Sequence, residues 1–298
     1  MIELAYRIKN DDSVIKIVVS ELERFRPEEI IAFILEKIRT LAKTKLQGDV
    51  STAVISVPVF YGDRQKQATK DAAHSAGFEV VHLIPEPTAV ALAYQFENKI
   101  DAEQERNILI YNFGRVSLDV SIINAKGNFC DLLTADFDCH LGGRDLDREI
   151  YKYVWEELRK CKKDSKLKKL RLLQLSENCK TYLSTNPRFF FTRNSSRIEQ
   201  NFGIPVTREN FEEIASHIFD KAMEVVENCL KKAKLEKDGI DVIVMVGGCT
   251  RIPKVRKMVE EYFGKDKVKY LMDSNYQIAR GAIVHASTLK SNKTEKIS

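Results

Sequence analysis

The sequence predicts an α/β protein with two lobes, because the same β-α-β-α pattern occurs twice along the chain. The first copy runs from Ala53 to Phe96, and the second from Asp241 to Leu289. An apolar three-stranded meander, Ile108 to Ala135, precedes the second copy. Repetition of a whole unit indicates an internal duplication, and regular alternation of strands with helices is typical of the α/β class.

The elements up to the end of the first copy follow from apolar periodicity and from proline and glycine positions. Pro27 suits the first turn of a helix that carries an apolar stripe and runs to Leu46. Asp63 is expected to cap the next helix, and Gly77 to end it. The other expected elements are strands Glu3 to Ile8, Val14 to Val19, Ala53 to Val57 (buried) and Val80 to Ile84, and the helix Thr88 to Phe96.

The second half of the chain contains the meander, an insert and the second copy. The insert, Gly142 to Ala215, is expected to be mostly helical. The meander strands are Ile108 to Tyr111, Leu118 to Ile123 and Phe129 to Ala135, with a turn at Asn124 to Asn128. The second copy consists of strand Asp241 to Val246, helix Pro253 to Phe263, strand Val268 to Met272 and helix Asn275 to Leu289.

Composition narrows the class of protein. The 298 residues are 44% hydrophobic and 31% charged, as in an ordinary globular protein. A net charge of +5 is too small to imply a nucleic-acid partner, and the lack of an 18-residue apolar run predicts no membrane span. The six cysteines are widely spread without a CxxC, which indicates reduced thiols in the cytoplasm or the nucleus.

The stretch Asn107 to Ser121 reads as a strand, a turn and a second strand. A phosphate-binding hairpin needs a turn almost free of side chains, so that backbone N–H groups can close around the phosphates. Here Gly114 is followed by Arg115 and Val116. A β-branched residue is a genuine outlier at positive φ, so this turn is expected to take a different shape.

Four motifs in order make the chain resemble one known family. These motifs are Ala53 to Tyr94, HLGGRDLD (His140 to Asp147), SENCKTYLS (Ser176 to Ser184) and VGGCTRIPKV (Val246 to Val255). Together they resemble the ATPase domain of the seventy-kilodalton heat-shock chaperones, from about Phe25 to the C-terminal helix. The resemblance implies an actin-like (ribonuclease H-like) two-lobed ATPase fold that binds ATP or ADP with magnesium.

Compared with that family, lobe one is expected to be incomplete. The meander that carries the family's first phosphate hairpin and a reaction-centre lysine has no counterpart before Pro27. Missing strands would leave a sheet edge and apolar faces uncovered. We therefore expect residues 1–100 and 275–298 to form an incomplete lobe one, and 101–274, insert 142–215 included, a complete lobe two. No substrate-binding domain is expected.

On the phosphate side, the resemblance places Gly114 and Ser117 at the phosphates and Asp119 and Glu86 at a magnesium ion, through water. Asn112 and Asn275 stand where the family has aspartates, and a neutral amide cannot take a proton. Loss of an acid–base group typically costs about 10²–10⁴-fold in rate. The alternatives are structural: Asn112 as a strand end, Asp119 as a polar strand residue and Glu86 as a favourable first-turn residue.

Two readings of Arg115 stay open. It could pair directly with a phosphate, or lie exposed on a relaxed hairpin.

The nucleoside side matches the family better. Glu177, Lys180 and Ser184 fall on one helical face, and the resemblance gives them ribose and adenine contacts. Gly247 and Gly248 open a turn after an apolar strand, where backbone can approach a ligand closely. Arg251 matches an adenine-side arginine. Ordinary surface helix and loop is the alternative for these residues.

These observations predict a chaperone-like protein that binds adenine nucleotide and hydrolyses it weakly or not at all. Two other hypotheses remain: a non-catalytic module that binds cochaperones of the nucleotide-exchange or J-domain type, and a decayed gene product. Neither a nucleic-acid nor a membrane partner is expected.

Overall fold

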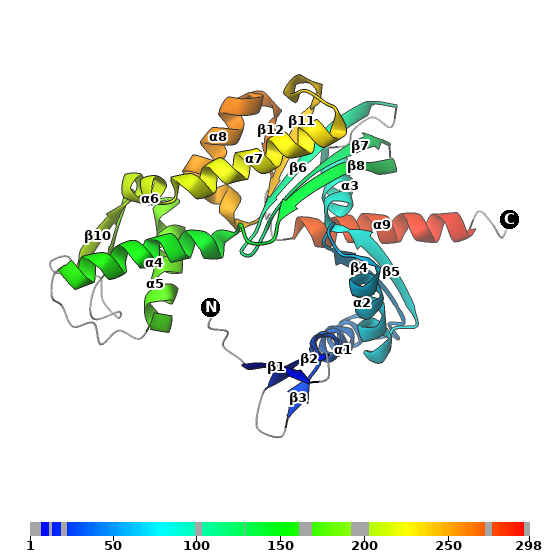
Figure 1. Ribbon diagram of the computed structural model, residues 1–298. Coiled ribbons are helices and arrows are strands. Elements are labelled where there is room, and N and C mark those ends of the chain that lie inside the picture. The colour runs from blue at the N-terminus through cyan, green and yellow to red at the C-terminus, as the bar shows by residue number, and fades with distance from the viewer. Residues whose placement is uncertain are drawn as a thin grey trace. The chain divides into compact units, whose positions relative to one another are not determined.

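The structure is a computed structural model that describes residues 7–11, 14–18, 23–98, 103–127, 129–160, 169–191, 203–271 and 276–294 (Figure 1). The chain divides into two compact units, Met1–Glu86 with His285–Ser298, and Pro87–Val284. The lobe boundaries expected from the sequence stay predictions.

The first unit contains two small sheets and two main helices. The helix that begins at Pro27 has the predicted bounds, whereas the next helix begins with Asp63 and its N-cap is Gly62, so the predicted cap was one residue late. Gly77, at φ +88°, follows that helix as expected. The elements are antiparallel β1 (Arg7–Asp11), β2 (Val14–Val18) and β3 (Arg24–Phe25), α1 (Pro27–Leu46), β4 (Thr52–Val57), α2 (Asp63–Ser75) and β5 (Val80–Pro85), which pairs parallel with β4.

Apolar side chains of α1 are exposed in the first unit. No α1 residue is buried, and Ile34, Ile38 and Leu41 are each more than half exposed. The strand β4 exists, but the prediction that it is buried was wrong except at Val57, because its sheet has two strands within the described part of the chain. A small core cluster around Phe78 holds this unit together.

The second unit is built on a five-stranded sheet of order β12-β11-β6-β7-β8. The predicted meander is confirmed, and its strands are longer than predicted because the antiparallel ladder continues through polar residues to Glu105 and Lys126. The strands are β6 (Glu105–Phe113), β7 (Leu118–Lys126), β8 (Phe129–Asp138), β11 (Val242–Val246) and β12 (Val268–Tyr270).

Helices cover both faces of this sheet. On one face α4, α7 and α8 pack over Tyr111 and Phe113, in a large apolar core. On the other face α3 contributes Val90 and Tyr94 to a second core. The helices are α3 (Glu86–Asn98), α4 (Gly143–Lys160), α5 (Lys169–Leu183), α6 (Arg208–Ile214), α7 (Ser216–Ala233), α8 (Pro253–Phe263) and α9 (Gln277–Thr294).

The predicted insert holds α4, α5, α6 and a short hairpin of β9 (Arg188–Phe191) with β10 (Ile204–Thr207). Asn275, the predicted start of the last helix and a predicted site residue, lies outside the described residues, as do Met272, Asn128 and Cys161. None of the described helices is long and apolar enough to cross a bilayer.

Candidate functional site

The turn between β6 and β7 is closed by a hydrogen bond and has an unstrained backbone. The N–H of Gly114 donates to the carbonyl of Ser117 at 3.0 Å. None of the residues Gly114 to Ser117 has a positive φ. Arg115 and Val116 therefore avoid the left-handed region, in agreement with the expected change of turn shape.

This turn presents carbonyl groups to the start of α4. The N–H of Gly143 donates to the Gly114 carbonyl at 3.0 Å, and the N–H of Arg144 to the Arg115 carbonyl at 2.9 Å. A Cβ at Gly142 would lie 2.5 Å from the Arg115 carbonyl oxygen, so glycine is required for this approach. The first N–H groups of a helix favour anions, but here two of them already have carbonyl partners.

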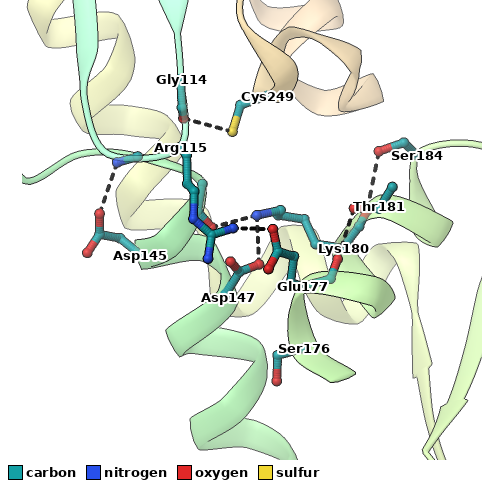
Figure 2. Close-up of polar contacts among 12 residues, drawn as sticks. Gly114, Arg115, Asp145, Asp147, Ser176, Glu177, Lys180, Thr181, Ser184 and Cys249 are labelled. Atoms are coloured by element: carbon teal, nitrogen blue, oxygen red, sulfur yellow. Dashed lines mark hydrogen bonds and ion pairs between the residues drawn. The ribbon is translucent and has the colours of Figure 1, made fainter. Parts of the chain in front are cut away.

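The side chain of Arg115 reaches across to α5, where it forms an ion pair with Glu177 (Figure 2). Both side chains are partly exposed, 58% for Arg115 and 41% for Glu177. Arg115 thus lies at the hairpin turn, and its guanidinium is held by a carboxylate predicted to face the ribose.

A second ion pair, which is buried, joins α5 to α4. The ammonium of Lys180 is 2.7 Å from a carboxylate oxygen of Asp147 and donates to the Gly143 carbonyl at 2.7 Å. Burial raises the pKa of Asp147, and the positive charge of Lys180 opposes that rise. The Cys249 thiol donates to the Gly114 carbonyl at 3.2 Å, and burial raises its pKa to about 11. One N–H donor of Lys180 is therefore used by the main chain, and its charge is balanced by Asp147.

The turn after β11 contains one glycine with a positive φ and one exposed glycine. Gly247 has φ +88°, and a Cβ there would lie 2.4 Å from the Phe113 carbonyl oxygen. A Cβ at Gly248 would meet nothing within 4 Å, so this backbone faces open space. Arg251 is exposed in the same turn. Ser184 follows the last residue of α5 rather than lying on it, and its hydroxyl donates to the Lys180 carbonyl at 3.3 Å.

Asn112 and Asp119 are direct partners across the β6–β7 ladder, so their side chains share one face of the sheet. Asp119 is only 8% exposed, and burial raises the pKa of its carboxyl to about 6. Ser117 donates to one of its oxygens at 3.3 Å, whereas the other has no hydrogen-bond partner in the described part of the chain. A water molecule bound to a cation is a suitable hydrogen-bond donor to that oxygen.

Glu86 is half-buried at the first position of α3 and belongs to the first unit. Its placement relative to Asp119 stays a prediction. Among the described residues, no three His, Cys, Asp or Glu side chains gather closely enough to bind a metal ion directly.

The residues present fit the groups of a magnesium nucleotide unequally. The orphaned oxygen of Asp119 fits a magnesium ion that keeps its waters. The open space beside Gly248 leaves room for a ligand at the turn after β11. The turn at Gly114 does not fit a triphosphate in a backbone cage, because it has no left-handed residue and directs two carbonyls toward α4.

An antiparallel meander extended on one side by two parallel strands, with helices on both faces of the sheet, defines a lobe of the actin-like nucleotide-binding class. Comparison with known proteins makes the assignment specific: the profile of the family described as "Hsp70 protein" matches residues 1–298. The chain belongs to the Hsp70 family, and its fold is accordingly the actin-like ATPase fold.

Several named relatives are similar over most of this chain. A heat shock 70 kDa protein of Emericella nidulans is 39% identical over 93% of the chain and 43% of its own length. A heat shock protein of Pyricularia oryzae is 35% identical over 97% of the chain and 48% of its own length. Heat shock cognate 70 kDa protein 3 of Dictyostelium discoideum is 36% identical, with 97% and 47% covered. The chain thus spans less than half the length of these relatives.

Sequence reasoning missed two features of this site. Asp147 lies in the HLGGRDLD motif, and its acidic side chain on an otherwise apolar helix face was the available signal. Gly142, in the same motif, lets the hairpin and α4 meet backbone to backbone, and Gly143 leaves room for the Cys249 thiol and the Lys180 ammonium. The structure brings Gly114, Glu177 and Lys180 into one cluster through these residues.

Proposed function

We propose that this chain binds adenine nucleotide mainly through its nucleoside and hydrolyses it weakly or not at all. The observation that carries the proposal is the contrast between two turns. The Gly247–Gly248 turn is open to a ligand, whereas the Gly114–Ser117 turn has exchanged its N–H cage for carbonyls bonded to α4.

Loss of hydrolysis would follow from the same region. Asn112 is neutral and cannot accept a proton from attacking water. Asp119, its ladder partner, is buried with a pKa of about 6 and stays mostly ionised at neutral pH, where it could orient magnesium-bound water. Asp119 alone would orient water, but without backbone N–H groups around the phosphates little would stabilise the negative charge that develops as the phosphate is transferred to water.

The test is titration calorimetry with adenosine, ADP and ATP in magnesium, paired with a single-turnover hydrolysis assay. We expect binding of all three ligands and hydrolysis at least 10²-fold below that of a family member with the full cage. Absence of heat with every ligand at high protein concentration contradicts the binding claim. Turnover equal to that of the family member contradicts the inactivity claim.

A second candidate function is a non-catalytic module that binds cochaperones, in the cytoplasm or the nucleus. The internal pairs Arg115–Glu177 and Lys180–Asp147 favour it, because they occupy side chains that a nucleotide would otherwise use. Capture of a nucleotide-exchange or J-domain protein in nucleotide-free buffer is the expected result, and failure of both to bind at micromolar concentration argues against it.

A further inference from the structure

The exposed cation of the cluster is Arg115, at the tip of the β6–β7 hairpin. Lys180, the other cation drawn in the cluster (Figure 2), is buried and bonded to Asp147 and to the Gly143 carbonyl. The Arg115 side chain is 58% exposed, and its partner Glu177 is 41% exposed. Ion pairs this exposed contribute about 0–1 kcal/mol, so an anion that binds a guanidinium more strongly can displace Glu177.

Part of the backbone around Arg115 is already engaged in hydrogen bonds within the protein. The Gly114 N–H is bonded to the Ser117 carbonyl, and the first N–H groups of α4 are bonded to the Gly114 and Arg115 carbonyls. An anion at this turn therefore finds three nearby N–H groups already bonded to carbonyls, and the Arg115 guanidinium is the exposed group there that carries a full positive charge. A guanidinium can bind two phosphate oxygens at once in a planar fork.

We propose that Arg115 is the anion-binding group of this site and that Glu177 competes with the incoming phosphate for it. The ligand class is a terminal phosphate or pyrophosphate, and the inference deepens the proposed nucleotide binding, on which it rests. Arg115 replaces a cage of backbone amides with one mobile cation. One guanidinium binds two phosphate oxygens in ADP and in ATP alike. The two nucleotides should therefore bind with nearly equal affinity.

Three probes separate the parts of the ligand: adenosine, ADP and inorganic pyrophosphate, each titrated by calorimetry in 50 mM and 500 mM salt. In the unmodified chain we expect ADP to bind about tenfold more tightly than adenosine, and this gain to fall in high salt. Arg115→Gln should remove the gain and abolish measurable pyrophosphate binding. Glu177→Gln should raise pyrophosphate affinity about threefold or more.

A matched pair of controls lies on α8, where Lys257 and Glu261 form another exposed ion pair at 3.8 Å. Lys257→Gln and Glu261→Gln make the same changes of net charge and should alter no affinity by more than twofold. All four substitutions are at exposed positions, where thermal stability should change little, and melting curves establish that each variant is folded.

The outcomes distinguish this inference from the proposed function. Adenosine binding with pyrophosphate affinity unchanged by Arg115→Gln overturns the role of Arg115 and leaves nucleoside binding in place. Pyrophosphate binding that needs Arg115, without adenosine binding, supports the anion site and overturns the proposed nucleotide function. Pyrophosphate affinity that Glu177→Gln leaves unchanged overturns the competition, and failure of every probe to bind overturns both proposals.

Discussion

At the scale of single residues, the buried carboxylate of Asp119 should make stability depend on pH. Its pKa is raised to about 6 by burial, against about 3.9 in an unfolded chain. The folded state therefore binds the proton more tightly, and this group stabilises the fold as pH falls below 6. Linkage gives about 1 kcal/mol more stability at pH 5 than at pH 7.5 from Asp119 alone.

Asp119→Asn should remove that contribution, because an amide does not titrate in this range. Urea denaturation of both proteins at pH 5 and pH 7.5 measures it. Asp147, whose pKa is also raised by burial, is present in both proteins and cancels in the difference. The variant should gain more stability at pH 7.5 than at pH 5, and equal shifts at both pH values would show that Asp119 titrates normally.

A second residue-scale prediction concerns Lys180, whose ammonium is buried against Asp147. Lys180→Met leaves a buried carboxylate without its cation, which typically costs about 3–5 kcal/mol. The double variant Asp147→Asn with Lys180→Met should recover part of that loss, because no charge is then left unpaired. Urea midpoints of the three proteins measure the effect.

The matched control for Lys180 is Lys152→Met on α4, which breaks an exposed pair with Glu149. It should change stability by at most about 1 kcal/mol. If both lysine variants unfold at the same urea concentration, the Lys180–Asp147 pair contributes no more to stability than an exposed pair, and Lys180 remains available to a ligand.

At the scale of elements, the turn after β11 depends on one of its two glycines. Gly247→Ala forces alanine to φ +88° and places its Cβ 2.4 Å from the Phe113 carbonyl oxygen. The left-handed conformation and the overlap together should cost about 2 kcal/mol or more. Gly248→Ala meets no atom within 4 Å and should stay within about 1 kcal/mol of the parent.

Thermal unfolding of the two alanine variants measures this difference, and adenosine affinity gives a second reading. The strand β6 carries Phe113 as its last residue, so displacement of its carbonyl also disturbs the hairpin turn. A Gly248→Ala variant that is as unstable as Gly247→Ala would mean that the turn is constrained by something other than the approach to β6.

The sequence predicted the helices and strands well where proline or glycine positions agree with the apolar periodicity. Pro27 and the apolar stripe gave α1 its observed bounds. The meander strands were predicted too short, because polar residues such as Glu105 and Lys126 are held by the ladder rather than by burial. The cap of α2 was displaced because the Gly62 N–H bonds the Gln65 side chain, which a preference for Asp does not anticipate.

The candidate site was predictable as a set of positions but not as a set of contacts. The spacing of Glu177 and Lys180 on one helix indicated a shared face. Their opposite environments, one half-exposed and the other buried, depend on Arg115 and Asp147 from distant segments. Ion pairs between such distant segments produce no periodic pattern in the sequence. The structure was therefore needed to show that these side chains are paired with one another.

At the scale of the whole molecule, the two compact units have very different cores. In the first unit, the described core cluster is Ala73, Ala76 and Phe78, and α1 has no buried residue. In the second, helices bury both faces of a five-stranded sheet. Regions with few buried apolar contacts open at lower free energy, so the first unit should unfold before the second.

Hydrogen exchange followed by peptide should show this order. Amides of β4 and β5 should exchange faster than amides of β6 and β7, and Phe78→Ala, which removes a ring only 6% exposed, should accelerate the first pair alone. Phe211→Ala, at 1% exposure in the second unit, is the matched control and should accelerate β6 and β7. If each variant accelerates both pairs equally, the units unfold as one cooperative body, and the uncovered apolar surface of α1 costs the fold no independent stability.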